Sequence, residues 1–206
     1  MNSQQHGPWV KICGLTTPEA VAAAIDAGAD AIGFVFAESV RRVEPSLARR
    51  LAAPARGKVA CVAVTRHPGQ PEVDEILATF RPDVLQSDAQ DLQRLTLPRE
   101  LERLPVLRTW RRDSALPPRL LFEGAVSGAG RPCDWQLAGA VARRVQLVLA
   151  GGLDPDNVAE AIATVRPFGV DVSSGVELRP GVKDPDAVVR FVAAARSART
   201  AVLEQS

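Results

Sequence analysis

A thiol and a carboxylate stand at the ends of two short apolar runs, and this pair of residue types could move protons. Cys13 ends the run VKIC, and Glu123 ends the run RLLFE. A thiolate can act as a base, and a carboxyl group that keeps its proton near neutral pH can act as an acid. Lys11 would point to the same side of a strand as Cys13, so its cation could favour the thiolate. Burial among the apolar residues before Glu123 would help that carboxyl keep its proton.

Both residues also have structural interpretations. A free cysteine is most often a small buried side chain. The carboxylate of Glu123 could have only a structural role, in which it accepts hydrogen bonds from the backbone N–H groups of the loop. The chain must therefore bring other suitable groups to the same place before a catalytic role is favoured.

Two glycine-containing loops could bind a phosphate. The stretches LAGGL at 149–153 and DVSSGVE at 171–177 place small residues directly after apolar runs. Small residues let backbone N–H groups close on a phosphate, and barrel enzymes commonly bind one at the loops after strands seven and eight. The alternative is that these glycines only turn the chain. Two such loops together favour phosphate binding.

The elements that must position these residues alternate between strand and helix patterns. Eight apolar runs are candidate strands, at 10–13, 31–36, 58–64, 83–86, 105–110, 119–123, 145–150 and 168–174. Helix patterns begin near Thr17, Pro45, Pro71, residue 89, Trp135, Pro155 and Pro185, the second ending near Ala53 and the last near Ala198. The fifth unit is the exception, because 107–118 has no helical stripe and is expected to be mostly loop.

This alternation predicts an α/β protein formed by a single (β/α)8 TIM barrel over residues 1–206, with 1–8 as a loose leader and 199–206 as a frayed tail. In such barrels the chemistry lies at the carboxyl ends of the strands. The positions selected by that rule are Cys13, the residues after Phe36, Thr65-Arg66, Gln86 to Asp88, Arg108, Glu123, Ala150 to Leu153 and Asp171 to Glu177.

Composition and charge argue against several other classes of function. The net charge is +1 and the 22 arginines are scattered among acidic residues, so we expect no nucleic-acid partner. The longest apolar runs, about seven residues, are far below the roughly 20 needed to cross a bilayer, and the N-terminus lacks a signal-peptide core. We expect a cytoplasmic protein with no membrane contact. Cys13, Cys61 and Cys133 lack metal-type spacing and only two histidines occur, so we expect no metal.

Motifs along nearly the whole chain, from Val10 to about Ala198, carry a more specific signal. They are VKICGL at 10–15, GADAIGFVF at 28–36, Ser39 and Arg41 as S-x-R, CDW at 133–135, LAGGL with Asn157 and Val158, and GVDVSSGVE followed by PGVKD at 169–184. In these motifs and their order the chain resembles the phosphoribosylanthranilate isomerase family of tryptophan biosynthesis. The resemblance implies an Amadori rearrangement of N-(5'-phosphoribosyl)anthranilate on a (β/α)8 barrel, without a cofactor.

The resemblance also implies roles for individual residues. In that family a cysteine on strand one is the general base and an aspartate on strand six is the general acid. Cys13 matches the base, and counting back from Asp134-Trp135 places Glu123 at the position of the acid. Arg41 would hold the anthranilate carboxylate of a small phosphorylated substrate. The phosphate would lie at backbone amides near Gly152, Leu153, Ser174 and Gly175. We expect a monomer or a homodimer.

Three departures from the family pattern keep alternatives open. Glu123 stands where aspartate is expected, Gln86-Ser87-Asp88-Ala89 replaces Q-L-H-G, and strand three ends in Thr65-Arg66. One added methylene advances a carboxyl by about 1 Å, and misplacement on that scale can cost on the order of 100-fold in rate. A repurposed or weakly active barrel that still binds a sugar phosphate is therefore an alternative. A Schiff-base aldolase is disfavoured, because only Lys11 lies inside a suitable strand.

Overall fold

The computed structural model describes residues 7–111, 114–124 and 133–203, and within these ranges eight parallel strands form a closed barrel. Each strand pairs with its neighbours in the sequence, and β8 pairs with β1 to close the ring. The strands are β1 (Trp9–Cys13), β2 (Ala31–Val35), β3 (Ala60–Val64), β4 (Val84–Asp88), β5 (Glu102–Leu107), β6 (Arg119–Phe122), β7 (Gln146–Leu149) and β8 (Gly169–Val172). The expected (β/α)8 barrel is confirmed.

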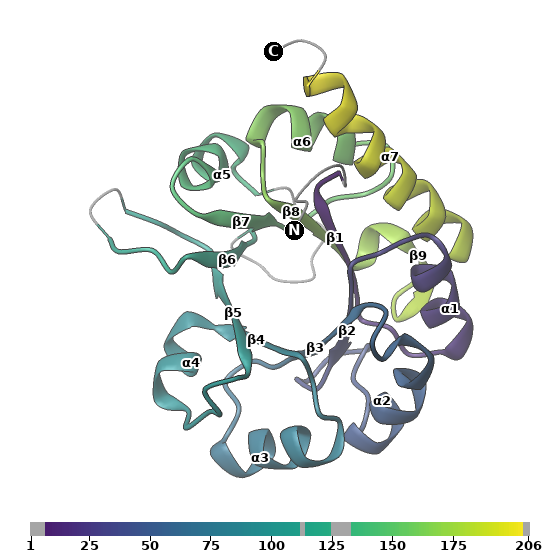
Figure 1. The fold of residues 1–206 in the computed structure, drawn as a ribbon, viewed down its shortest axis with the longest axis vertical. Helices are drawn as coiled ribbons and strands as arrows, with labels where there is room; N and C mark the ends of the chain where they lie inside the picture. Colours follow the sequence, from purple (N-terminus) through teal and green to yellow (C-terminus); the bar gives the residue numbers. More distant parts are fainter. Residues whose placement is uncertain (1–6, 112–113, 125–132, 204–206) are drawn as a thin grey trace.

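Helices surround the ring of strands (Figure 1). They are α1 (Pro18–Asp26), α2 (Pro45–Leu51), α3 (Gln70–Thr79), α4 (Ala89–Arg94), α5 (Trp135–Ala142), α6 (Val158–Val165) and α7 (Pro185–Leu203). The described residues between β5 and β6 hold no helix, as expected for 107–118. α7 packs beside both α1 and α6, which joins the last unit to the first. No helix in the described ranges is long and apolar enough to span a membrane.

A short excursion follows β8 on the mouth side of the barrel. It consists of a 3-10 turn, η2 (Ser174–Val176), and an antiparallel pair, β9 (Glu177–Arg179) and β10 (Val182–Lys183). Gly181 lies between these two strands with φ +83°, a value that favours glycine. Glu177 on β9 and Lys183 on β10 face each other in this antiparallel pair.

The barrel strands are apolar on both faces because both faces are covered. Outward side chains such as Ile12 and Ile32 pack with the helices, and inward ones such as Ala31 and Val62 fill the barrel. Complete burial of a valine or isoleucine side chain stabilises the fold by about 1.5–3 kcal/mol. This two-sided burial explains why the strands appear in the sequence as continuous apolar runs.

Alternation along the strands decides which polar residues face the mouth. Val106 and Leu121 belong to the apolar interior of the barrel. Arg108 lies two residues after Val106, and Glu123 lies two residues after Leu121. Because side chains alternate along a strand, both also point toward the inside of the barrel. The same rule directs Cys13 inward. Residues that are distant in sequence therefore meet at the carboxyl ends of the strands.

Some boundaries differ from those expected. β5 begins at Glu102, earlier than the apolar run at 105–110, because main-chain pairing with β4 extends over two exposed polar residues. α6 begins at Val158 and not near Pro155, since the Asp154 carboxylate accepts the N–H groups of Asp156 and Asn157 in a preceding turn. α7 continues to Leu203, so the chain expected to fray from 199 is helical up to that residue. Residues 1–6 of the expected leader and 204–206 of the tail lie outside the described ranges.

Candidate active site at the barrel mouth

Cys13 lies inside the mouth beside an ion pair. Nζ of Lys11 is 2.8 Å from Oδ1 of Asp171, which is the partner of Lys11 in the pairing of β1 with β8. Gly33 on β2 makes room for these side chains: a Cβ there would lie 3.0 Å from Sγ of Cys13 and 3.1 Å from Cε of Lys11. A thiol, an ammonium group and a carboxylate thus form one buried cluster, in which Lys11 and Cys13 share a face as expected.

Burial dominates the electrostatics of this thiol. It raises the pKa of Cys13 above its ordinary value, although the cations of Lys11 and Lys183 oppose the rise. Burial alone would lower the pKa of Lys11, but attraction to Asp171 and Cys13 outweighs it, and the pKa of Lys11 is raised. The free protein therefore holds a neutral thiol beside a charged lysine. Lys11 favours the thiolate, as expected, but does not overcome burial.

Glu123 meets an arginine from the neighbouring strand end. Its Oε1 lies 2.8 Å from Nη2 of Arg108, and Nη1 of the same arginine lies 2.6 Å from Oδ1 of Asp88 at the end of β4. The Glu123 side chain is 15% exposed. The side chain is therefore mostly buried, as expected, but its carboxylate meets the cation of Arg108, which was not expected. The loop that follows, residues 125–132, lies outside the described ranges.

Arg41, the residue expected to hold a substrate carboxylate, is paired with a carboxylate of the protein. Its Nε and Nη2 lie 2.7 and 2.8 Å from the two oxygens of Glu177. Nζ of Lys183 lies 2.7 Å from the same carboxylate and donates to the carbonyl of Ser173. Burial would raise the pKa of Glu177, but hydrogen bonds from Arg41 and Lys183 hold it below its ordinary value. Burial also lowers the pKa of Lys183.

The two glycine loops meet through their backbones. Gly151 and Gly152, after β7, have φ of +90° and +69°, which favours glycine at both positions. Asn157 braces this loop, because its Nδ2 donates to the Gly152 carbonyl at 2.8 Å. A Cβ on Gly175, after β8, would lie 1.9 Å from the carbonyl oxygen of Leu153. The structure therefore brings together the four residues expected at the phosphate, which are Gly152, Leu153, Ser174 and Gly175.

The altered stretch after β4 contributes polar groups to the mouth. Gln86 is buried, and its Oε1 has no hydrogen-bond partner among the described residues. An orphaned buried acceptor is costly, so a ligand that donates a hydrogen bond would stabilise it. Asp88, in place of the family's histidine, anchors Arg108.

Several residues at this site had no role assigned from the sequence. Arg108, Asp171 and Glu177 were expected at the carboxyl ends of the strands, but no role was assigned to them. Lys183, which lies on β10, was not among the expected positions. The alternation of strands offers a signal for Asp171, which faces inward like Lys11 on the neighbouring strand. No comparable signal was available for the Arg41–Glu177 pair, because its contact joins the loop after β2 to β9, 136 residues later in the chain.

Comparison with known proteins identifies one family. The family model for N-(5'phosphoribosyl)anthranilate (PRA) isomerase matches residues 10–194. A protein of Rhizobium rhizogenes named N-(5'-phosphoribosyl)anthranilate isomerase is 40% identical over 204 aligned residues, covering 89% of this chain and 92% of the relative.

Solved structures agree with the sequence comparison. A phosphoribosyl anthranilate isomerase from Thermus thermophilus superposes with a TM-score of 0.76 at 30% identity, over 91% of this chain and 98% of that one. A phosphoribosyl anthranilate isomerase in complex with reduced 1-(o-carboxyphenylamino)-1-deoxyribulose 5-phosphate has a TM-score of 0.74 at 30% identity, with 91% and 98% coverage.

Proposed function

The chain belongs to the N-(5'-phosphoribosyl)anthranilate isomerase family, and we propose that it performs this family's Amadori rearrangement with Cys13 as base and Glu123 as acid. The product is 1-(2-carboxyphenylamino)-1-deoxy-D-ribulose 5-phosphate, and the step belongs to tryptophan biosynthesis. The observation that supports the assignment is the meeting of both residues with the paired glycine loops at one barrel mouth. No cofactor takes part in the proposed reaction.

The reaction divides into proton transfers that balance. The carboxylic acid of Glu123 gives its proton to the furanose ring oxygen, the C1–O bond breaks, and the nitrogen lone pair forms the C=N bond of an iminium ion. Cys13 first releases its thiol proton to solvent; its thiolate then removes the proton from C2, and the electron pair of that C–H bond forms an enolamine. The Cys13 thiol returns a proton to C1, and the C2 hydroxyl gives its proton to the Glu123 carboxylate, which leaves the ketone and restores the acid. Acid–base groups in such roles contribute about 100- to 10,000-fold each.

The ion pair behind Cys13 supports its role as base. Because burial raises the pKa of Cys13, its thiolate needs a nearby positive charge, and Lys11 supplies one. Asp171 keeps Lys11 protonated and fixed, with 2.8 Å between Nζ and Oδ1. The charge of Lys11 is therefore held permanently beside the sulfur.

Substrate anchoring uses the remaining groups of the mouth. Glu177 pairs with the edge of Arg41 that carries Nε and Nη2, so the edge that carries Nη1 can meet the anthranilate carboxylate. The phosphate binds backbone N–H groups near Gly152, Leu153, Ser174 and Gly175. Oε1 of Gln86 can accept a hydrogen bond from a sugar hydroxyl. In this account a monomer or homodimer works on a small phosphorylated substrate in the cytoplasm.

A weakly active or repurposed sugar-phosphate-binding barrel is the second candidate. It is favoured by Glu123 at the position of the expected aspartate and by Gln86-Ser87-Asp88-Ala89 in place of Q-L-H-G. The aldolase alternative loses support at Lys11, because a Schiff-base lysine needs a lowered pKa and that of Lys11 is raised. Burial lowers the pKa of Lys183, but its Nζ is held by Glu177 and the Ser173 carbonyl and it lies outside the barrel strands.

Spectroscopic turnover of phosphoribosylanthranilate by the wild type and by Cys13→Ala separates these candidates. We expect the wild type to turn over substrate and Cys13→Ala to lose about 100- to 10,000-fold in kcat, with inorganic phosphate still bound. A wild type that binds phosphate but shows no turnover would support the repurposed barrel. Cys13→Ala with wild-type kcat would remove Cys13 from the mechanism.

A further inference from the structure

A row of acidic and basic side chains runs along the ends of β3 to β6 and includes Glu123. Glu123 lies 2.8 Å from Arg108, which lies 2.6 Å from Asp88. Asp88 is 3.8 Å from Nε2 of His67, and Nδ1 of His67 is 3.4 Å from Asp91. The proposed acid thus belongs to a row of charged side chains that also contains Arg108, Asp88 and Asp91.

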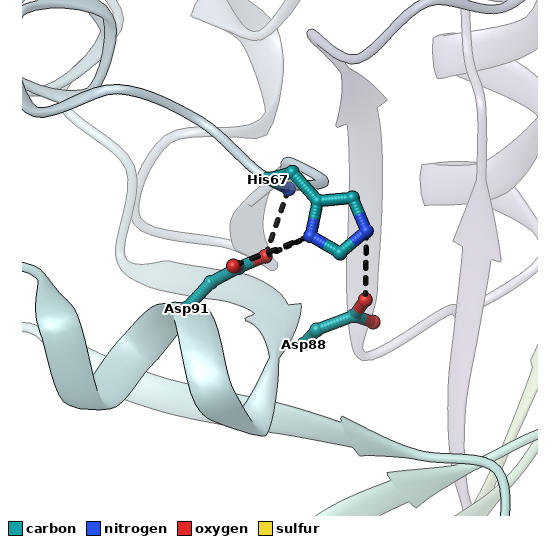
Figure 2. A group of neighbouring side chains, drawn as sticks. All are labelled: His67, Asp88 and Asp91. Carbon is teal, nitrogen blue, oxygen red and sulfur yellow. Dashed lines mark hydrogen bonds and ion pairs between the residues drawn. The ribbon is translucent and has the colours of Figure 1, made fainter.

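The far end of this row is firmly fixed. Asp91 is 1% exposed and accepts hydrogen bonds from the His67 backbone N–H at 2.8 Å, from the Ser87 hydroxyl at 3.2 Å and from Arg94. His67 has φ +51°, a conformation uncommon for a residue with a side chain, and its bonds to Asp91 stabilise it. Figure 2 shows the imidazole ring between the two aspartates. Asp88 therefore lies beside a histidine whose backbone is held by Asp91.

His67, Asp88 and Asp91 also have the chemistry of metal ligands, with ligand atoms within 4.8 Å of one another. Their arrangement does not suit an ion. Arg108 and Arg94 already pair with the two carboxylates. We therefore assign this group to the support of Asp88.

We propose that Arg108, anchored by Asp88, is a positioning residue that holds the Glu123 carboxyl in place for proton transfer, an inference that rests on the proposed function. Glu has one more rotatable bond than the aspartate expected from the family pattern. A longer acid therefore needs an outside contact to select one rotamer. Arg108 makes this contact through Nη2 while Asp88 holds Nη1, so the planar guanidinium is fixed on both sides.

A double-mutant cycle tests the coupling between the two residues. We expect Arg108→Gln to lower kcat roughly 10- to 100-fold while KM changes less than about threefold, because the phosphate and the carboxylate bind elsewhere. Arg108→Lys keeps the charge without the fork and should recover part of the loss. In a Glu123→Ala background Arg108→Gln should cost less than about twofold, since no carboxyl remains to be positioned. Arg103→Gln, at an exposed position of the same strand, is the matched control and should leave kcat unchanged.

Two outcomes overturn the proposal. Arg108→Gln that retains wild-type kcat shows that Glu123 needs no such contact. An equal loss in the wild-type and Glu123→Ala backgrounds shows that Arg108 acts independently of Glu123. Thermal unfolding of each protein separates these results from loss of fold, and Arg108→Lys replaces Arg108→Gln in the cycle if the latter does not fold. Failure of the proposed function looks different, because the wild type would then show no turnover of phosphoribosylanthranilate, and failure of the acid assignment would leave Glu123→Ala with wild-type kcat.

Discussion

The contact between the two glycine loops can be tested at Gly175. A Cβ there would lie 1.9 Å from the carbonyl oxygen of Leu153, whereas an ordinary carbon–oxygen contact begins at about 3.3 Å. In Gly175→Ala the loops after β7 and β8 must therefore separate by about 1.4 Å. A hydrogen bond to a charged group contributes about 1.5–3 kcal/mol, so losing one N–H contact with the phosphate weakens binding about 10- to 150-fold.

The inhibition constant of inorganic phosphate and the KM for phosphoribosylanthranilate measure this effect. We expect Gly175→Ala to raise both by about 10- to 150-fold and to lower the free energy of unfolding by about 1–3 kcal/mol, as overpacking does. Gly69→Ala is the matched control, because its Cβ would have its nearest neighbour at 3.7 Å, and both constants should stay at wild-type values. A folded Gly175→Ala protein that binds inorganic phosphate as tightly as the wild type would refute the placement of the phosphate between these loops.

Two further predictions concern the buried charges of the mouth. The Cys13 thiol should titrate above its ordinary range because burial raises its pKa, and Lys11→Met should move the titration to still higher pH because an opposing cation is lost. Ultraviolet thiolate absorbance in a Cys61→Ser, Cys133→Ser background measures both, and a thiolate formed near neutral pH would contradict the burial argument. Glu177→Gln should raise KM about tenfold without changing the inhibition constant of inorganic phosphate, because an amide cannot accept both N–H groups of Arg41. An unchanged KM would show that Arg41 does not depend on Glu177.

The features predicted best from the sequence depend on regular periods. Eight buried parallel strands produce continuous apolar runs, and the order of strands in the barrel follows the order in the chain. Strand alternation then places Cys13 at the mouth, because side-chain direction depends only on position along the strand. The loops after β7 and β8 were predicted to lie together for the same topological reason.

The features missed from the sequence depend on side chains that reach across between elements. Arg108 can bridge Asp88 and Glu123 because its strand lies between theirs, but the sequence does not show how far each side chain extends. The apolar residues before Glu123 indicated burial, and the side chain is only 15% exposed, but they gave no sign that its carboxylate meets Arg108. The pair of Arg41 with Glu177 depends on a β9–β10 excursion that gave no apolar run in the sequence.

The kcat of Glu123→Ala with phosphoribosylanthranilate decides whether Glu123 is the acid of the rearrangement. Loss of the acid should lower kcat about 100- to 10,000-fold while inorganic phosphate binds as in the wild type. Glu123→Asp, measured beside it, shows whether the site is fitted to the longer acid, since a site held by Arg108 should lose rate with the shorter side chain. A Glu123→Ala protein with the kcat of the wild type would contradict the account.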